Sequence, residues 1–65
     1  MSKYEFIVHH ELYPTSLGCR WTTEAESEEE ANAKADKICV KLQHGVKPKK
    51  RQGPLVHTPA KLIEN

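Results

Sequence analysis

The sequence predicts an α+β fold in which a small antiparallel sheet packs on one α-helix, in the order β-β-α-β. Three observations predict it: residues 3–12 alternate between two faces, residues 19–25 do so again after a turn, and a capped helical stripe follows at 27–45. A chain of 65 residues forms one domain at most, here 1–65. Its core is expected to be thin, with one sheet face packed against one helix.

The first two segments read as a β-hairpin. In 3–12 the even-numbered residues are Tyr, Phe, Val, His and Leu, which is typical of a strand with one buried face. In 19–25 the inward residues are expected to be Cys19, Trp21, Thr23 and Ala25. A short turn containing proline and glycine separates the two segments and favours antiparallel pairing.

The helix has signals at both ends. Ser27 followed by Glu30 fits a capping box, in which each side chain satisfies a backbone N–H at the helix start. Gly45 suits the left-handed residue that closes a helix. Between them, apolar side chains recur at helical spacing, widened by Cys39; they are Ala31, Ala35, Ile38 and Leu42.

This stripe predicts how the two layers pack. The alanines let the helix lie close to the sheet. We expect Ile38 and Leu42 to dock beside Phe6 and Val8, which would use up the available apolar surface. Only the charged periphery would then remain for recognition.

The last third of the chain is predicted in three pieces. Residues 46–54 form a basic, flexible loop rich in proline and glycine, and residues 55–57 form a short third strand. Residues 59–65 are either a short helix that Thr58 and Pro59 begin, or a frayed or extended tail.

Composition limits the location and the redox state. No signal segment or membrane-spanning run is present, which favours a cytoplasmic protein without membrane contact, either a monomer or a small homo-oligomer. Cys19 and Cys39 do not form a disulfide framework, and we expect two buried, reduced thiols rather than a bridge.

No catalytic residue, metal ligand or cofactor is predicted. His9 and His10 are neighbours on a strand and project to opposite faces, so they cannot easily chelate one ion. A mixed site of Cys19, Cys39 and a histidine is conceivable, but metal-binding spacings such as C-x-x-C are missing. Both cysteines are expected to face the core, so an enzyme is not expected.

The two signs of charge are segregated along the chain although the net charge is only +1. An acidic run surrounds the helix start, where carboxylates also stabilise the helix dipole. From this run we predict Glu26, Glu28 and Glu29 as one partner-binding region. The basic loop supplies the other, formed by Lys47, Lys49, Lys50 and Arg51.

The basic loop is open to a second interpretation besides a solvated loop. Its charges can contact phosphates without reading base sequence. A direct DNA- or RNA-binding protein would use this loop together with Arg20, with Lys3 extending the footprint and Trp21 or Tyr13 stacking on a base.

In size and element order the chain is similar to several tiny phage-encoded proteins, among them inhibitors of host RNA polymerase and some anti-CRISPR proteins. The most similar stretch is Ala25-Glu26-Ser27-Glu28-Glu29-Glu30-Ala31. The resemblance implies an inhibitor of a host nucleic-acid-processing machine, such as an RNA polymerase or a CRISPR effector. We therefore expect a non-enzymatic protein-binding module whose partner is a larger protein or nucleoprotein complex, with direct nucleic-acid binding as the alternative.

Overall fold

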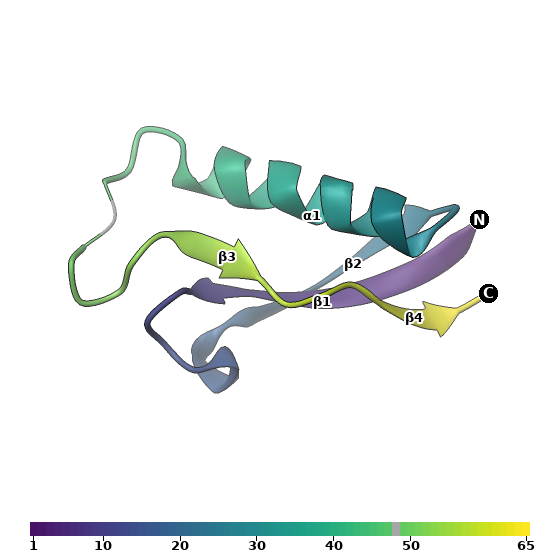
Figure 1. Ribbon diagram of the computed structural model, residues 1–65, viewed down its shortest axis with the longest axis horizontal. Helices are drawn as coiled ribbons and strands as arrows, with labels where there is room; N and C mark the ends of the chain where they lie inside the picture. Colours follow the sequence, from purple (N-terminus) through teal and green to yellow (C-terminus); the bar gives the residue numbers. More distant parts are fainter. Residues whose placement is uncertain (48) are drawn as a thin grey trace.

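The computed structural model describes residues 1–47 and 49–65. Its elements are, in chain order, β1 (Ser2–His10), the 3-10 turn η1 (Thr15–Leu17), β2 (Cys19–Ala25), α1 (Glu28–Gln43), β3 (Leu55–His57) and β4 (Lys61–Glu64). Figure 1 shows α1 lying along one face of the sheet, with both chain termini at the end where α1 begins. The predicted α+β class is confirmed.

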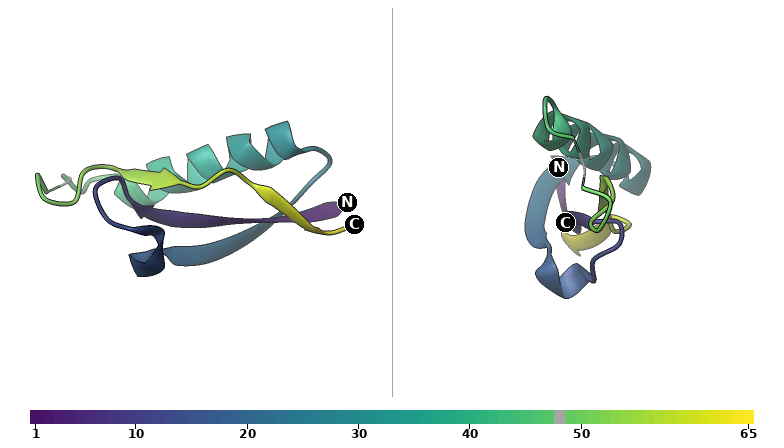
Figure 2. Two further views of the ribbon diagram at one scale, coloured as in Figure 1. Left: turned by 60° about the horizontal axis from the view of Figure 1, so that its bottom comes forward. Right: turned by 90° about the vertical axis from the view of Figure 1, so that its left-hand side faces the viewer.

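β1 is the central strand of the sheet. It pairs antiparallel with β2 on one side, where Phe6 lies opposite Trp21. On its other side it pairs first with β3, where His9 lies opposite Val56, and then with β4. Figure 2 shows the chain from β3 to β4 running alongside β1, so that these two short strands share one edge of the sheet. The hairpin and the strand at 55–57 are therefore confirmed.

Strand β4 occupies part of the segment 59–65, for which the sequence left a short helix or a frayed or extended tail open. Leu62 lies opposite Tyr4 in an antiparallel pairing that shifts register between Lys3 and Tyr4. The physical reason is that β3 covers only one part of the outer side of β1. The remaining backbone N–H and C=O groups of β1 need partners, and an extended chain supplies them.

The core lies between the sheet and α1, as predicted. Tyr4, Phe6 and Val8 are buried, and Phe6 is the largest side chain that is fully buried among the described residues. The helix contributes Ala31, Ala35 and Cys39 to the same core. Both alanines are fully buried, so α1 approaches the sheet closely.

The expectation for Leu42 is wrong. Ile38 packs at the margin of the cluster around Phe6 and Val8, but Leu42 retains 44% of its surface exposed. The stripe that actually faces the sheet steps by four residues from Ala35 to Cys39, which leaves Leu42 on the flank of the last helical turn. Apolar surface therefore remains outside the core.

Both predicted helix ends are present, with one difference. The Ser27 Oγ accepts a hydrogen bond from the Glu30 N–H at 3.2 Å. The Glu30 carboxylate accepts from the Glu26 N–H at 3.3 Å, rather than from the Ser27 N–H as in a standard capping box. At the other end, Gly45 adopts φ 76°, which is the left-handed conformation predicted for it.

Gly18 is required by a close approach of two chain segments. A Cβ atom at this position would lie 2.6 Å from the Val8 carbonyl oxygen and 2.7 Å from the Ile7 Cγ2. The absence of a side chain lets the chain pass from η1 into β2 directly against β1. The hairpin loop is thereby pressed onto the end of the sheet, which positions Leu17 beside it.

Candidate protein-binding surfaces

An apolar hollow lies at the end of the molecule where α1 finishes. It has a volume of about 310 Å³, and its walls come from α1, η1 and the strands β1 to β3. Leu17 and Leu42 contribute to its lining while 68% and 44% exposed, and Trp21 lies beside them. Two exposed leucines and the tryptophan of this small domain therefore line the same partly open hollow.

A second hollow adjoins it. This one has a volume of about 360 Å³ and lies between the last turns of α1 and β3, with Val40 and His44 in its wall. Leu55 lines both hollows, so they are neighbours on either flank of the helix end. Val40 is 70% exposed and extends the apolar surface. We call this whole region the apolar end; it is formed by Leu17, Trp21, Val40, Leu42 and Leu55.

Cys19 borders the first hollow, and the prediction that its thiol is buried is wrong. The two cysteines are free, and Cys39 is buried as expected, but Cys19 is exposed. It is the first residue of the edge strand β2 and lines the hollow together with Leu42. Burial, followed by the nearby Asp36 carboxylate, raises the pKa of the Cys39 thiol. Cys39 therefore remains a protonated apolar side chain at neutral pH.

The basic loop belongs to the same end of the molecule. Lys47, Lys49, Lys50 and Arg51 are all exposed. Backbone hydrogen bonds tie the returning part of the loop to the chain beyond β1: the Glu11 N–H donates to Pro54 and the Leu12 N–H to Gln52, each at 2.9 Å. The loop that carries the four cations therefore lies at the same end of the molecule as the apolar end, and its flexibility stays a prediction.

The acidic region lies at the opposite end. Glu26, Glu28 and Glu29 are exposed at the start of α1, a helix of 16 residues, which separates them from the basic loop by about 24 Å at 1.5 Å per residue. Figure 1 shows the loop and the helix start at the two ends of the long axis. The structure therefore does not bring the two predicted contact regions together.

Arg20 does not join the basic loop. Its Nε lies 2.6 Å from the Glu5 carboxylate, and its side chain is on the sheet face away from α1. Trp21 lies on the face toward α1 and packs against the core, so the two residues proposed to act together on a nucleic acid point to opposite faces. Tyr13 is half-buried, with its ring edge-on to His10 at 5.8 Å between centroids.

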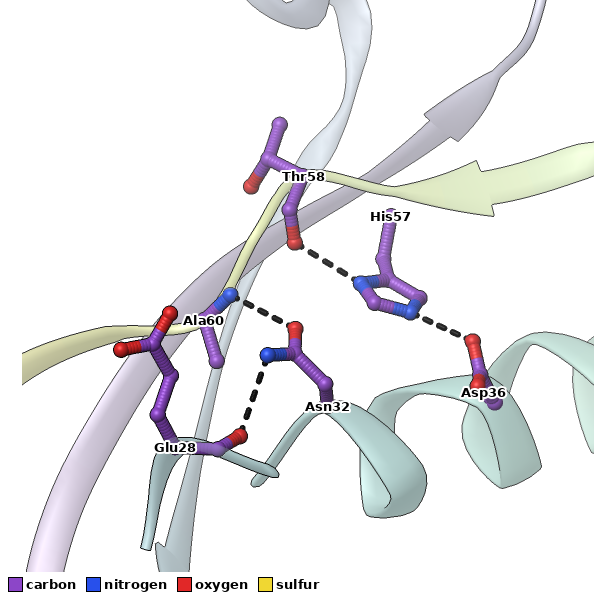
Figure 3. A network of polar contacts seen from close by, with 6 residues as sticks. All are labelled: Glu28, Asn32, Asp36, His57, Thr58 and Ala60. Atoms are coloured by element: carbon purple, nitrogen blue, oxygen red, sulfur yellow. Dashed lines mark hydrogen bonds and ion pairs between the residues drawn. The ribbon is translucent and has the colours of Figure 1, made fainter. Parts of the chain in front are cut away.

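A polar network joins α1 to the connection between β3 and β4 (Figure 3). The His57 Nε2 lies 2.6 Å from the Asp36 carboxylate, and its Nδ1 lies 2.7 Å from the Thr58 carbonyl oxygen. The Asn32 side chain donates to the Glu28 carbonyl and accepts from the Ala60 N–H. Both ring nitrogens of His57 are engaged within the chain, so the network anchors β4 to the helix.

The rings of His9 and His10 also contact backbone groups. The Nδ1 of His9 lies 2.9 Å from the His10 carbonyl, and the Nδ1 of His10 lies 3.2 Å from the Gly53 carbonyl. In the part of the chain that the structure describes, no three His, Cys, Asp or Glu side chains gather closely enough to hold a metal ion. The same part contains no helix with the length and apolarity needed to cross a membrane.

Sequence reasoning missed the apolar end because it placed Leu42 in the core and treated Leu17 as part of a turn. Leu17 was the available signal, since it is an apolar residue within an otherwise polar turn, Tyr13–Gly18.

Comparison of the chain with protein-family models, with curated proteins and with solved structures gave no match.

Proposed function

We propose that this chain is a non-enzymatic protein-binding module that contacts its partner through the apolar end. The observation that carries the proposal is the exposure of Leu17 and Leu42 around a hollow that also contains Trp21. Apolar side chains make up only 37% of this chain. Leaving two leucines and part of a tryptophan uncovered at one place is typical of a contact surface, in which a few buried side chains provide most of the affinity.

The basic loop supports the same surface as its rim. Interfaces commonly combine an apolar centre with a charged periphery that steers association and fixes orientation. Lys47, Lys49, Lys50 and Arg51 would favour a partner that presents an apolar side chain within an acidic surround. Glu26, Glu28 and Glu29 stand at the other end of α1, and we propose that they stabilise the helix start instead of forming part of this contact.

The kind of inhibitor that this chain would be, its partner and its cellular compartment stay predictions. An inhibitor of a host RNA polymerase or of a CRISPR effector would be a cytoplasmic protein whose partner is a large nucleoprotein complex. Because such a complex contains nucleic acid as well as protein, the test needs a control for nucleic acid.

A second candidate function is direct nucleic-acid binding through the basic loop. The exposure of Lys47, Lys49, Lys50 and Arg51 favours it, because phosphate contacts require accessible cations. Arg20 would contribute little because Glu5 already neutralises it locally. Binding of this kind weakens steeply with salt, and neutralising Lys49, Lys50 and Arg51 should abolish it without unfolding the chain.

The test is affinity capture from a host lysate, with and without nuclease, using three baits: the wild type, the Leu17→Ala/Leu42→Ala double variant, and the matched surface control Glu28→Lys/Glu29→Lys. The proposal predicts that one specific protein is retained after nuclease treatment by the wild type and the charge variant, and is lost with the double leucine variant. Retention that disappears with nuclease would instead favour the nucleic-acid function. Loss with the charge variant alone would move the contact to the acidic end.

A further inference from the structure

The two edges of the sheet are protected to different degrees. On the β3 side, the Leu55 N–H donates to the Gln43 side chain at 2.9 Å, and β4 is short with an irregular register. On the other side lies β2, a strand of seven residues. Within residues 1–47 and 49–65, β2 pairs with β1 and with no other strand. A long unpaired edge is a template for another strand.

The hydrogen bonds of Ile7 show which groups of β2 face outward. Its carbonyl accepts from the Thr58 N–H, and its own N–H donates to the Thr58 Oγ1, each at 2.9 Å. Ile7 therefore points its backbone groups away from β2. Because this direction alternates along a strand, its neighbours Phe6 and Val8 point theirs toward β2.

The same alternation applies to β2 itself. Phe6 and Val8 lie opposite Trp21 and Cys19, so these residues of β2 use their backbone groups on β1. The intervening residues, Arg20, Thr22 and Glu24, must then direct their N–H and C=O groups to the open edge. Their side chains are exposed on the sheet face away from α1.

We propose that this edge pairs with β2 of a second copy of the chain. Thr22 is the middle residue of Cys19–Ala25, so a two-fold axis through Thr22 pairs the strand with itself over its full length. In that antiparallel register Thr22 faces Thr22 of the other copy. Arg20 faces Glu24, and the second copy repeats this pair by symmetry. The outward backbone N–H and C=O groups of the two strands then lie opposite each other. Arg20, which already lies 2.6 Å from the Glu5 carboxylate of its own copy, gains a second carboxylate directly across from it.

The long-range charge distribution agrees with this arrangement. A two-fold axis through Thr22 runs the two copies in opposite directions, which turns the acidic helix start of each copy toward the end that carries the basic loop in the other. The sheet continues across both copies, with the two helices on one face. The self-pairing also removes the long edge that β2 would otherwise expose.

Lys34 limits how tightly the copies associate. Its Nζ donates to the Glu24 carbonyl oxygen at 2.6 Å and lies 3.4 Å from the Glu30 carboxylate. That carbonyl is one of the outward acceptors, so a second strand has to displace the lysine at both ends of the pairing. Association is therefore expected to depend on concentration, and removal of the Lys34 ammonium group should strengthen it.

Disulfide trapping tests the register on the intact chain. Hydrogen-bonded antiparallel partners lie about 5.5 Å apart at Cα, which is within disulfide range. In a Cys19→Ser background, Thr22→Cys should become a covalent dimer on mild oxidation. Ser16→Cys, an exposed turn position outside the edge, is the matched control and should stay monomeric. Failure of Thr22→Cys to cross-link, or equal cross-linking by both variants, would overturn the proposal.

Sedimentation of the purified chain alone tests the charge pairing. Glu24→Lys, which places a lysine opposite Arg20 of the other copy, should weaken self-association at least tenfold, and Lys34→Met should strengthen it. Leu42→Ala should leave it unchanged, which separates this inference from the function proposed for the apolar end. A wild-type chain that stays monomeric at millimolar concentration would overturn the dimer. So would equal association by Glu24→Lys, once circular dichroism shows that the variant is folded.

Discussion

Truncation of Leu42 tests whether this side chain belongs to the hydrophobic core or to a surface that binds a partner. We predict that Leu42→Ala lowers the free energy of unfolding much less than Val8→Ala does. The two side chains form a matched pair because both line the same hollow, yet Val8 is 5% exposed and Leu42 is 44% exposed. The comparison therefore varies burial while the neighbourhood stays the same.

The magnitudes follow from the exposed fractions. Full burial of a leucine contributes about 1.5–3 kcal/mol, and Leu42 is only about half buried, so its truncation should cost about 1 kcal/mol. Alanine is also the better helix former, which offsets a few tenths of that loss. Val8→Ala removes two methyl groups from a closed site at about 0.8 kcal/mol each and leaves a cavity, so we expect about 2 kcal/mol.

Urea unfolding measures both values, with the fluorescence of Trp21 as the signal, since it is the one tryptophan of the chain. Midpoints should be compared at unchanged slope, because a changed slope would indicate a different unfolding transition. A loss of unfolding free energy for Leu42→Ala that equals or exceeds that for Val8→Ala would contradict this prediction. Leu42 would then belong to the core, and the apolar end would lose its central side chain.

Three further predictions concern the close packing, the network and the pH dependence. Gly18→Ala would place a methyl group 2.6 Å from the Val8 carbonyl oxygen and should lower the free energy of unfolding by about 1–3 kcal/mol, measured by urea or thermal unfolding. Asn32→Ala removes the acceptor of the Ala60 N–H and should cost about 1–3 kcal/mol, with faster amide hydrogen exchange in β4 as the specific signature. Burial raises the pKa of the Cys39 thiol above its usual value of 9.0, so the unfolded chain loses this proton first as the pH rises. The contribution of this raised pKa to the free energy of unfolding is fully present below pH 9.0 and should decline above it. The free energy of unfolding of Cys39→Ala should therefore decline less steeply with pH.

Elements with local signals could be predicted from the sequence. The alternation around Phe6 and Val8 identified β1 and its buried face, and the pair Ser27 and Glu30 identified the start of α1. Gly45 marked its end because a left-handed residue there is a local requirement. These signals depend only on residues close in the sequence, so they can be recognised without knowledge of the rest of the fold.

Features that depend on distant partners could not be predicted. β4 is a strand because β1 has an unfilled side next to it, and nothing within Lys61–Glu64 reports that. Cys19 shares the inward face of β2, but it is exposed because the helix does not cover that corner of the sheet. The helical stripe likewise could not show that Leu42 lies beside the core instead of within it. Of these three departures from the sequence pattern, the exposure of Leu42 contributes to the apolar end.

The most direct test of the proposed contact is a nuclear magnetic resonance titration of the isotopically labelled chain with the captured protein. We predict that the amide signals of Leu17, Trp21, Leu42 and Leu55 shift or broaden at substoichiometric partner, while those of Glu28 and Glu29 stay in place. Perturbation confined to the acidic helix start, with the signals around the hollow unchanged, would contradict it.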